Sequence, residues 1–157
     1  MQRAVRMALT PSLHVHLAND HQELEVLLEQ LTSAFATGDR DVAAAAYRSF
    51  ERRLTEHFDF EEEQLFAEFA TVNPVEVSDL RAEHRAIRAR VEELAIGVDL
   101  HQTRLAAIQE LARMLREHAE REDRVLYPWA DRIATDPQRR SRLEQVLAHG
   151  SSSAVAS

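Results

Sequence analysis

Apolar residues recur at spacings of three and four along most of the chain, which is the pattern of amphipathic helices. The first stripe, residues 17–35, predicts a helix that begins after Pro11 and ends at Gly38. The second stripe begins near Arg40 and ends before Pro74, because the residue that precedes a proline disfavours helical geometry. These two stripes predict a helical hairpin with a short turn.

Two more stripes follow in the second half of the chain. Residues 77–94 predict a third helix, closed by Gly97 as a left-handed C-terminal cap. Residues 108–129 predict a fourth helix. Pro128 cannot donate a hydrogen bond to the carbonyl of Arg124, so we expect a kink or an early end of this helix.

Four long helices with short connections predict an all-α fold, an antiparallel up-down-up-down four-helix bundle. A short fifth helix is expected from Pro137 through Leu147. Three glycines and four prolines are too few for the many turns of an all-β fold. We therefore expect one bundle domain over residues 1–148 and a disordered tail over residues 149–157, which has nothing to bury.

Composition and charge narrow the range of partners. The 157 residues carry a formal charge of −8, which repels the phosphates of nucleic acids. No stretch approaches 18 uncharged residues, and the N-terminus lacks the apolar core of a signal peptide. The absence of cysteine excludes a disulfide framework and cysteine metal sites. We expect a cytoplasmic protein without nucleic-acid or membrane partners, and its oligomeric state stays open.

The second half of the chain repeats the first. His21 recurs 63 residues later as His84, and five residues around His57 recur 61 residues later. A duplicated hairpin predicts a pseudo-twofold bundle in which equivalent residues face one another across the core. The five residues are His57, Glu61, Glu62, Leu65 and Phe66, which return as His118, Glu122, Asp123, Leu126 and Tyr127.

Six polar residues occupy stripe positions where leucine or isoleucine is expected. A histidine and a glutamate four residues apart share one helix face, roughly 6 Å apart along the axis, so both can reach one inward site. A lone pair of this kind is usually exposed to solvent, and a lone histidine is usually a hydrogen-bonded core residue. Here the pair occurs twice in matching context. The six residues are His21, His57, Glu61, His84, His118 and Glu122.

The heights of these residues follow from counting helical residues from the turns. By this count three of the motif histidines and Glu61 lie at similar heights along the bundle: His21, His57 and His84. His118 comes level only if the fourth helix begins late, near Gln102 or Thr103. We therefore expect a late start, so that all six side chains meet.

A cation would account for acids and imidazoles in a core, because ionised carboxylates are costly to bury and two facing ones repel. Four imidazoles and two carboxylates suit iron, manganese or zinc and are too rich in nitrogen for calcium or magnesium. Six ligands suit two ions, each with two histidines and both bridged by the glutamates. The Glu-x-x-His pattern of ferritin-like proteins, the HExxH motif and glycine-rich phosphate loops are absent.

The ordered motif resembles the hemerythrin-like family of HHE cation-binding domains over about residues 13 to 130. The resemblance implies two iron ions, cycling between Fe2+ and Fe3+ and joined by an oxo or hydroxo bridge, with manganese or zinc less favoured. By this resemblance His21 and His57 bind one iron, His84 and His118 bind the other, and Glu61 and Glu122 bridge them. The motif consists of His21, His57-Phe-Asp-Phe-Glu61, His84, His118-Ala-Glu-Arg-Glu122 and Leu126-Tyr127-Pro128.

One departure from the family bears on function. Its oxygen carriers have a second histidine one turn away on the third helix, where this chain has Leu80 and Arg88. Open positions on the irons favour reaction with small molecules over reversible carriage of dioxygen. We expect a non-haem di-iron protein that binds, senses or reacts with O2, peroxide or nitric oxide. An enzyme that removes peroxide or nitric oxide, and an iron-responsive module that folds around its metal, remain alternatives.

Several residues near the motif have two interpretations. Glu25, one turn after His21, is either a further ligand or, as we favour, a surface residue. His14 is too far from His21 to share the site and would line an access path. Each of the four motif histidines follows an acidic residue, which either orients an imidazole or is a solvated flank. The apolar wall of the site is expected to comprise Leu24, Leu54, Leu65, Ile87, Leu115 and Leu126.

Overall fold

The computed structural model describes residues 12–99 and 105–152, and within these ranges it contains seven helices and no strand. The predicted all-α class is therefore confirmed. The four long helices are α1 (Leu13–Thr37), α2 (Arg40–Gln64), α4 (Pro74–Asp99) and α5 (Leu105–Arg124). The three remaining helices are α3 (Phe66–Phe69), α6 (Leu126–Ile133) and α7 (Pro137–Ser152).

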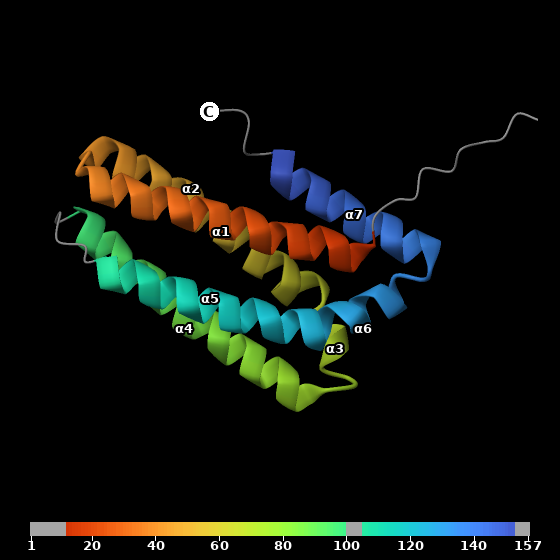
Figure 1. Ribbon diagram of the computed structural model, residues 1–157. Coiled ribbons are helices and arrows are strands. Elements are labelled where there is room, and N and C mark those ends of the chain that lie inside the picture. The colour runs from red at the N-terminus through yellow and green to blue at the C-terminus, as the bar shows by residue number, and fades with distance from the viewer. Residues whose placement is uncertain (1–11, 100–104, 153–157) are drawn as a thin grey trace, which may run out of the picture.

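The long helices lie side by side (Figure 1). α1 packs against α2 and α5, and α4 packs against the same two helices. The two short helices α3 and α6 lie near one end of this group, and α7 packs along α2. Side chains from all four long helices can therefore meet along a common axis.

Local capping chemistry defines the first hairpin. The Ser12 hydroxyl accepts a hydrogen bond from the Val15 N–H at 3.2 Å and begins α1. Gly38 ends this helix with φ of 73°, a left-handed conformation that other residues rarely adopt, as the sequence predicted. The carboxylate of Asp39 accepts a hydrogen bond from the Val42 N–H at 3.1 Å and begins α2 at once. The turn is therefore as short as the stripes required.

The end of the third long helix differs from the prediction. Gly97 lies inside α4, which continues to Asp99, so its assignment as a cap was wrong. Val98 is buried, and its packing extends the helix past the glycine. The predicted start of the next helix at Gln102 or Thr103 lies outside the described residues, and α5 is described from Leu105.

The second and fourth long helices are both interrupted just after the paired histidine and glutamate. The expected continuous helix up to Pro74 was wrong, because the backbone breaks at Leu65 and resumes as α3. This break brings Phe66 into the core beside Leu65, although neighbours on an unbroken helix point about 100° apart. The interruption expected from Pro128 falls at Val125 and separates α5 from α6. The first break contains no proline, so packing rather than a missing backbone donor accounts for it.

The C-terminal helix is longer than expected. α7 begins at Pro137 behind Asp136, whose carboxylate accepts a hydrogen bond from the Gln138 N–H at 3.2 Å. It continues past Leu147 to Ser152, so the tail boundary expected at residue 149 falls within the helix. Residues 153–157 lie outside the described residues. None of the described helices is long and apolar enough to cross a membrane.

The buried apolar residues form two separate clusters in the interior. One contains Leu17 and Leu80 and the other contains Leu24 and Ile87. On α1 and α4 the motif histidines fall between these two pairs of residues. Of the expected apolar wall, Leu115 is only half-buried, whereas the other five residues are buried: Leu24, Leu54, Leu65, Ile87 and Leu126.

Candidate metal centre

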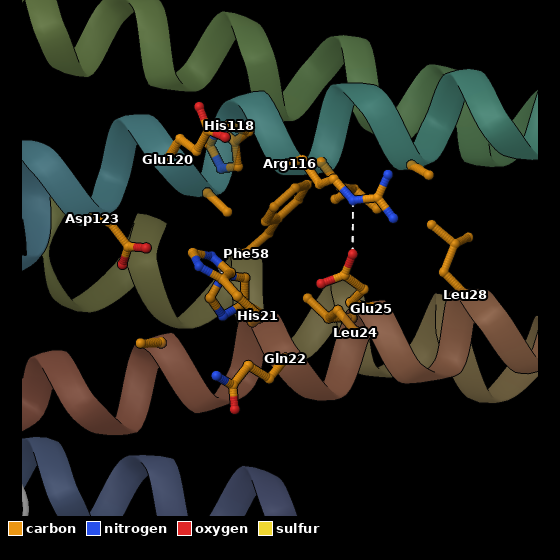
Figure 2. Close-up of a pocket in the computed structure, with 15 residues that line it drawn as sticks. His21, Gln22, Leu24, Glu25, Leu28, Phe58, Arg116, His118, Glu120 and Asp123 are labelled. Atoms are coloured by element: carbon orange, nitrogen blue, oxygen red, sulfur yellow. Dashed lines mark hydrogen bonds and ion pairs between the residues drawn. The ribbon is translucent and has the colours of Figure 1, made fainter.

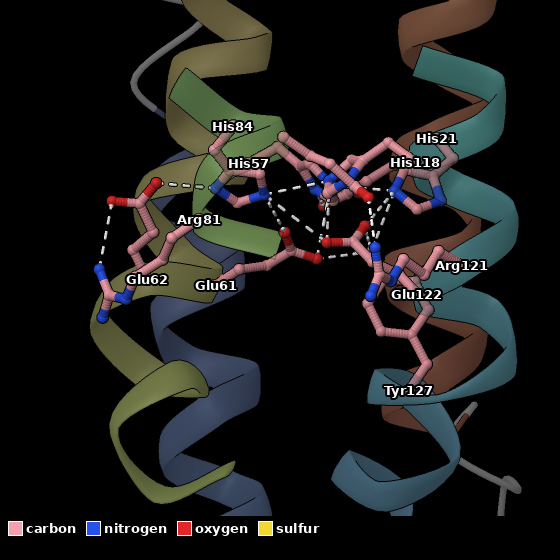
Figure 3. Close-up of polar contacts among 12 residues, drawn as sticks. His21, His57, Glu61, Glu62, Arg81, His84, His118, Arg121, Glu122 and Tyr127 are labelled. Carbon is pink, nitrogen blue, oxygen red and sulfur yellow. Dashed lines mark hydrogen bonds and ion pairs between the residues drawn. The ribbon is translucent and has the colours of Figure 1, made fainter. Parts of the chain in front are cut away.

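The six polar stripe residues lie together between the two apolar clusters (Figure 3). Five are almost fully buried, and the His21 side chain is 13% exposed. Their ligand atoms form two groups, and within each group all atoms lie within 4.8 Å of one another. The groups are His21, His57, Glu61 and Glu122, and Glu61, His84, His118 and Glu122.

The two glutamates belong to both groups, and each turns one oxygen toward each group. Glu61 Oε1 lies 3.6 Å from His57 Nε2, while its Oε2 lies 3.3 Å from His84 Nε2. Glu122 Oε2 lies 3.1 Å from His21 Nε2, while its Oε1 lies 2.9 Å from His118 Nε2. This is the arrangement of carboxylates that can bridge two cations.

Helix periodicity explains how the sequence builds this arrangement. His57 and Glu61 lie one turn apart on α2, and His118 and Glu122 repeat this spacing on α5. The first helix of each hairpin adds one more histidine, which is His21 on α1 and His84 on α4. Within each group the two imidazoles come close, with Nε2 atoms 3.1 Å apart between His21 and His57.

The hydrogen bonds of two histidines show that a cation fits between them. His84 Nδ1 donates to Glu62 Oε1 and His118 Nδ1 donates to Glu83 Oε2, both at 2.7 Å. Neutral imidazoles held in this way carry no proton on Nε2, yet these two Nε2 atoms lie 3.0 Å apart. Two nitrogen lone pairs at that distance repel unless a proton or a metal ion lies between them.

Two carboxylate oxygens also indicate that a cation fits in the cluster. Glu61 Oε2 and Glu122 Oε1 are buried and have no hydrogen-bond partner of good geometry among the described residues. A buried oxygen without a partner is costly, and coordination to a cation would remove that cost. Nitrogen and carboxylate ligands together suit iron, manganese or zinc. The residues present therefore fit a metal pair.

Protons occupy the cluster when no metal does. Burial disfavours a charged His84, but the carboxylates of Glu122 and Glu61 outweigh it and raise the pKa to about 9. Burial also opposes charge on His118, whereas Glu122 and Glu83 raise its pKa to about 10. Burial raises the pKa of Glu122, but its histidine neighbours, His118 foremost, lower it well below the usual value. A metal ion must displace these protons.

The sequence left open whether the acidic residues that precede the motif histidines orient imidazoles or are solvated. Two of the four lie beside a histidine of a neighbouring helix. Glu83, which precedes His84, contacts His118 on the next helix rather than its own neighbour. Asp20 likewise lies 3.5 Å from His57 Nδ1. Glu117 instead pairs with an arginine on the surface, as a solvated flank does. The fourth such residue, Glu56, lies 3.9 Å from Arg53 and forms no hydrogen bond or ion pair with a motif histidine in the described part of the chain.

Tyr127 belongs to the site, although sequence reasoning noted it only as a flank of the motif. Its fully buried hydroxyl donates to Glu61 Oε1 at 2.6 Å and lies 3.2 Å from Glu122 Oε2. It also lies 3.0 Å from His21 Nε2. Burial and the carboxylates, Glu122 foremost, raise its pKa well above the usual value. The sequence offered one signal for this role: the repeat has Phe66 at the equivalent position, so Tyr127 differs from it only by the hydroxyl group.

A pocket of about 370 Å³ between α1 and α5 leads to the cluster (Figure 2). At its rim Glu25 pairs with Arg116 at 2.7 Å and is half-exposed, which supports the surface interpretation of Glu25. His14 is not among the residues that line this pocket, but it lies 3.4 Å from Asp123, which is one of them, so its access role stays a prediction. The lining includes the motif histidines His21, His57 and His118 and the apolar residues Ala18, Leu24, Leu28, Phe58, Ala112, Leu115 and Ala119.

Comparison with known proteins adds one finding. A family model described as the hemerythrin HHE cation binding domain matches residues 13–130, which include all six residues of the cluster. The matched segment covers well over half of the chain and runs from the first residue of α1 into α6. Neither the curated proteins nor the solved structures give a significant match.

Proposed function

Because the chain belongs to the hemerythrin HHE cation-binding domain family, we propose that its cluster binds two iron ions and reacts with O2, peroxide or nitric oxide. One ion would be held by His21 and His57 and the other by His84 and His118. Glu61 and Glu122 would bridge them. When bound, the iron pair supplies one-electron chemistry between the ferrous and ferric states.

One observation carries the proposal, namely that two four-residue groups share both glutamates. A single ion could not accept all six ligands comfortably, whereas two ions give each group two nitrogens and two carboxylate oxygens. The proposal includes the antiparallel four-helix bundle that the sequence predicted. Its support is the closed ring of packed pairs formed by α1, α2, α4 and α5.

The chain's own residues leave room for an external ligand. On α4, the residues one turn on either side of His84 are Leu80, which is buried in an apolar cluster, and Arg88, which pairs with Glu62 and Asp59. Neither side chain can bind a metal ion in place of a further histidine. The pocket between α1 and α5 presents more apolar than polar surface and meets the cluster at His21, His57 and His118. Such a wall admits small uncharged molecules and excludes large polar substrates.

Metal analysis and one matched pair of variants test the proposal. Protein purified without added metal is expected to contain iron, to bind up to two ions per chain, and to change its optical spectrum on exposure to oxygen. Glu61→Leu restores an apolar stripe, so the variant should fold and lose the bridged pair. Glu63→Leu, on the exposed face of the same helix, is the control. Two irons with an unchanged spectrum in Glu61→Leu would contradict the bridging role.

Steady-state kinetics distinguish an enzyme from a binding protein or sensor. An enzyme would consume peroxide or nitric oxide over many turnovers, and His57→Ala should abolish that consumption. A binding protein or sensor would react once per metal pair and then stop.

A further inference from the structure

An arginine lies directly outside the carboxylate that orients His118. Glu83 Oε2 accepts a hydrogen bond from His118 Nδ1 at 2.7 Å, and Glu83 Oε1 accepts one from Arg121 Nη1 at 2.6 Å. Arg121 Nη2 also donates to Asp79 at 2.8 Å and to Glu76 at 3.1 Å, both on α4. Each oxygen of the Glu83 carboxylate therefore has its own partner, and the arginine that holds it is itself anchored.

Two more carboxylates outside the cluster are held between an arginine and a motif histidine. Asp20 turns one oxygen toward His57 Nδ1, at 3.5 Å, and pairs with Arg53 through the other. In all three cases the arginine and the carboxylate belong to different long helices. The three sets, here called the arginine triads, are Arg53–Asp20–His57, Arg88–Glu62–His84 and Arg121–Glu83–His118.

The internal repeat preserves a carboxylate of the triads but not its arginine. Asp20 and Glu83 are equivalent, 63 residues apart, and each orients a histidine of the next helix. The position equivalent to Arg53 is Met114, so the arginine that holds Glu83 comes from another place in the second half, Arg121. The same contact is therefore made from two positions that do not correspond, which indicates that the contact itself is needed.

The charge of these arginines does not explain their position. A positive charge near the cluster repels the cations that the cluster would bind. Exposed ion pairs contribute only about 0–1 kcal/mol to stability. The Arg53 and Arg121 side chains are drawn in against their carboxylates, 16% and 26% exposed, whereas Arg113 on the surface of α5 is 54% exposed. A role in holding the carboxylates accounts for this placement.

We propose that the arginines of the three triads are positioning residues for the metal centre, which strengthen iron binding without contacting iron: Arg53, Arg88 and Arg121. This inference rests on the proposed function, since it assumes that iron occupies the cluster. A carboxylate that orients a ligating imidazole fixes its ring and raises its basicity. A guanidinium group has several donors in one plane, so it can hold that carboxylate while other acceptors anchor it.

Anaerobic titration of the metal-free protein with Fe(II) tests the proposal by the sign of the change. Glu83→Ala should lower iron affinity about 10–100-fold, and Arg121→Ala should lower it about 10-fold, because the carboxylate is then free to turn away from His118. Through charge alone, loss of Arg121 would raise the affinity. Arg113→Ala is the control on the same helix, because Arg113 pairs only with surface glutamates of α5 among the described residues, and it should bind iron like the wild type.

A double-mutant cycle separates positioning from a merely structural role. If Arg121 acts through Glu83, adding Arg121→Ala to Glu83→Ala should cost no further iron affinity. The optical spectrum of iron-saturated Arg121→Ala should shift in the same direction as that of Glu83→Ala. A merely structural role would lower the free energy of unfolding and leave this spectrum unchanged. If Arg121→Ala fails to fold, Arg53→Ala and Asp20→Ala form the same cycle at His57.

The outcomes separate this inference from the proposed function. Unchanged or higher iron affinity in Arg121→Ala, or an equal loss with and without Glu83, would overturn the positioning role while leaving the di-iron proposal intact. A wild type that binds fewer than two irons would contradict the proposed function itself.

Discussion

A hydroxyl group at one residue distinguishes the two halves of the repeat at the centre of the molecule. Tyr127 stacks on His21 with ring centres 5.4 Å apart, much as Phe66 lies 5.2 Å from His84. The rings are equivalent, but only the tyrosine adds a hydrogen-bond donor to Glu61. The hydroxyl therefore holds the Glu61 carboxylate by a hydrogen bond that has no equivalent at Phe66.

Replacement of this hydroxyl should weaken metal binding without unfolding the protein. Tyr127→Phe makes the position match Phe66, so the ring stays packed while Glu61 loses its donor. We expect iron affinity in a titration to fall by about 10–100-fold, as for other residues that orient a ligand. Tyr47→Phe is the control, because Tyr47 bonds to Glu51 and the Val91 carbonyl, away from the cluster. Equal iron affinities in the two variants would show that the hydroxyl does not position Glu61.

The six cluster residues could be found from the sequence because each breaks a rule, placing a polar group where the stripe requires an apolar one. Tyr127 breaks no rule, since a tyrosine is acceptable on an apolar stripe, and it was missed as part of the site. The contact between Glu83 and His118 was also not predictable. It depends on how neighbouring helices are rotated about their axes, which periodicity within one helix does not report.

At the scale of helices, the number and order of the long elements followed from periodicity, whereas their ends depended on packing. Gly38 ends a helix because its backbone is left-handed, and Gly97 does not, although both follow an apolar stripe. The break at Leu65 has no local signal such as proline. It arises where the core accepts both Leu65 and Phe66, which is a property of the folded molecule.

Alanine substitution at the two glycines should change stability in opposite directions. At Gly38 a Cβ atom meets no other atom within 4 Å, so Gly38→Ala is penalised by backbone strain alone, about 1 kcal/mol. Gly97→Ala lies inside a helix and should raise the free energy of unfolding by up to about 1 kcal/mol. Chemical denaturation measures both changes. A lower free energy of unfolding in Gly97→Ala would contradict the position of this residue inside the helix and would favour a role as its C-terminal cap.

At the scale of the whole molecule, a polar layer separates two apolar clusters, and its charges make stability depend on metal and on pH. Buried carboxylates and imidazoles are tolerated in the metal-free state only with protons among them. Metal binding replaces those protons, so folding, metal and pH are linked.

The metal-free protein should lose stability as the pH rises above neutrality. Burial opposes the charge on His84 and His118, yet the cluster carboxylates raise their pKa values to about 9 and about 10. A raised histidine pKa contributes stability that is complete below the unfolded value of about 6.5 and is lost as pH rises through the folded values. We expect the free energy of unfolding to fall across this range. The iron-loaded protein, whose imidazoles have no such protons to lose, is the control, and equal slopes would contradict the explanation.

Anomalous X-ray diffraction at the iron absorption edge, from crystals of the iron-loaded protein, tests the central claim most directly. It locates iron atoms without assuming which side chains bind them. The account predicts two peaks in each molecule, one beside His21 and His57 and one beside His84 and His118, with Glu61 and Glu122 between them. A single peak, or iron bound only at the surface away from these six residues, would contradict it.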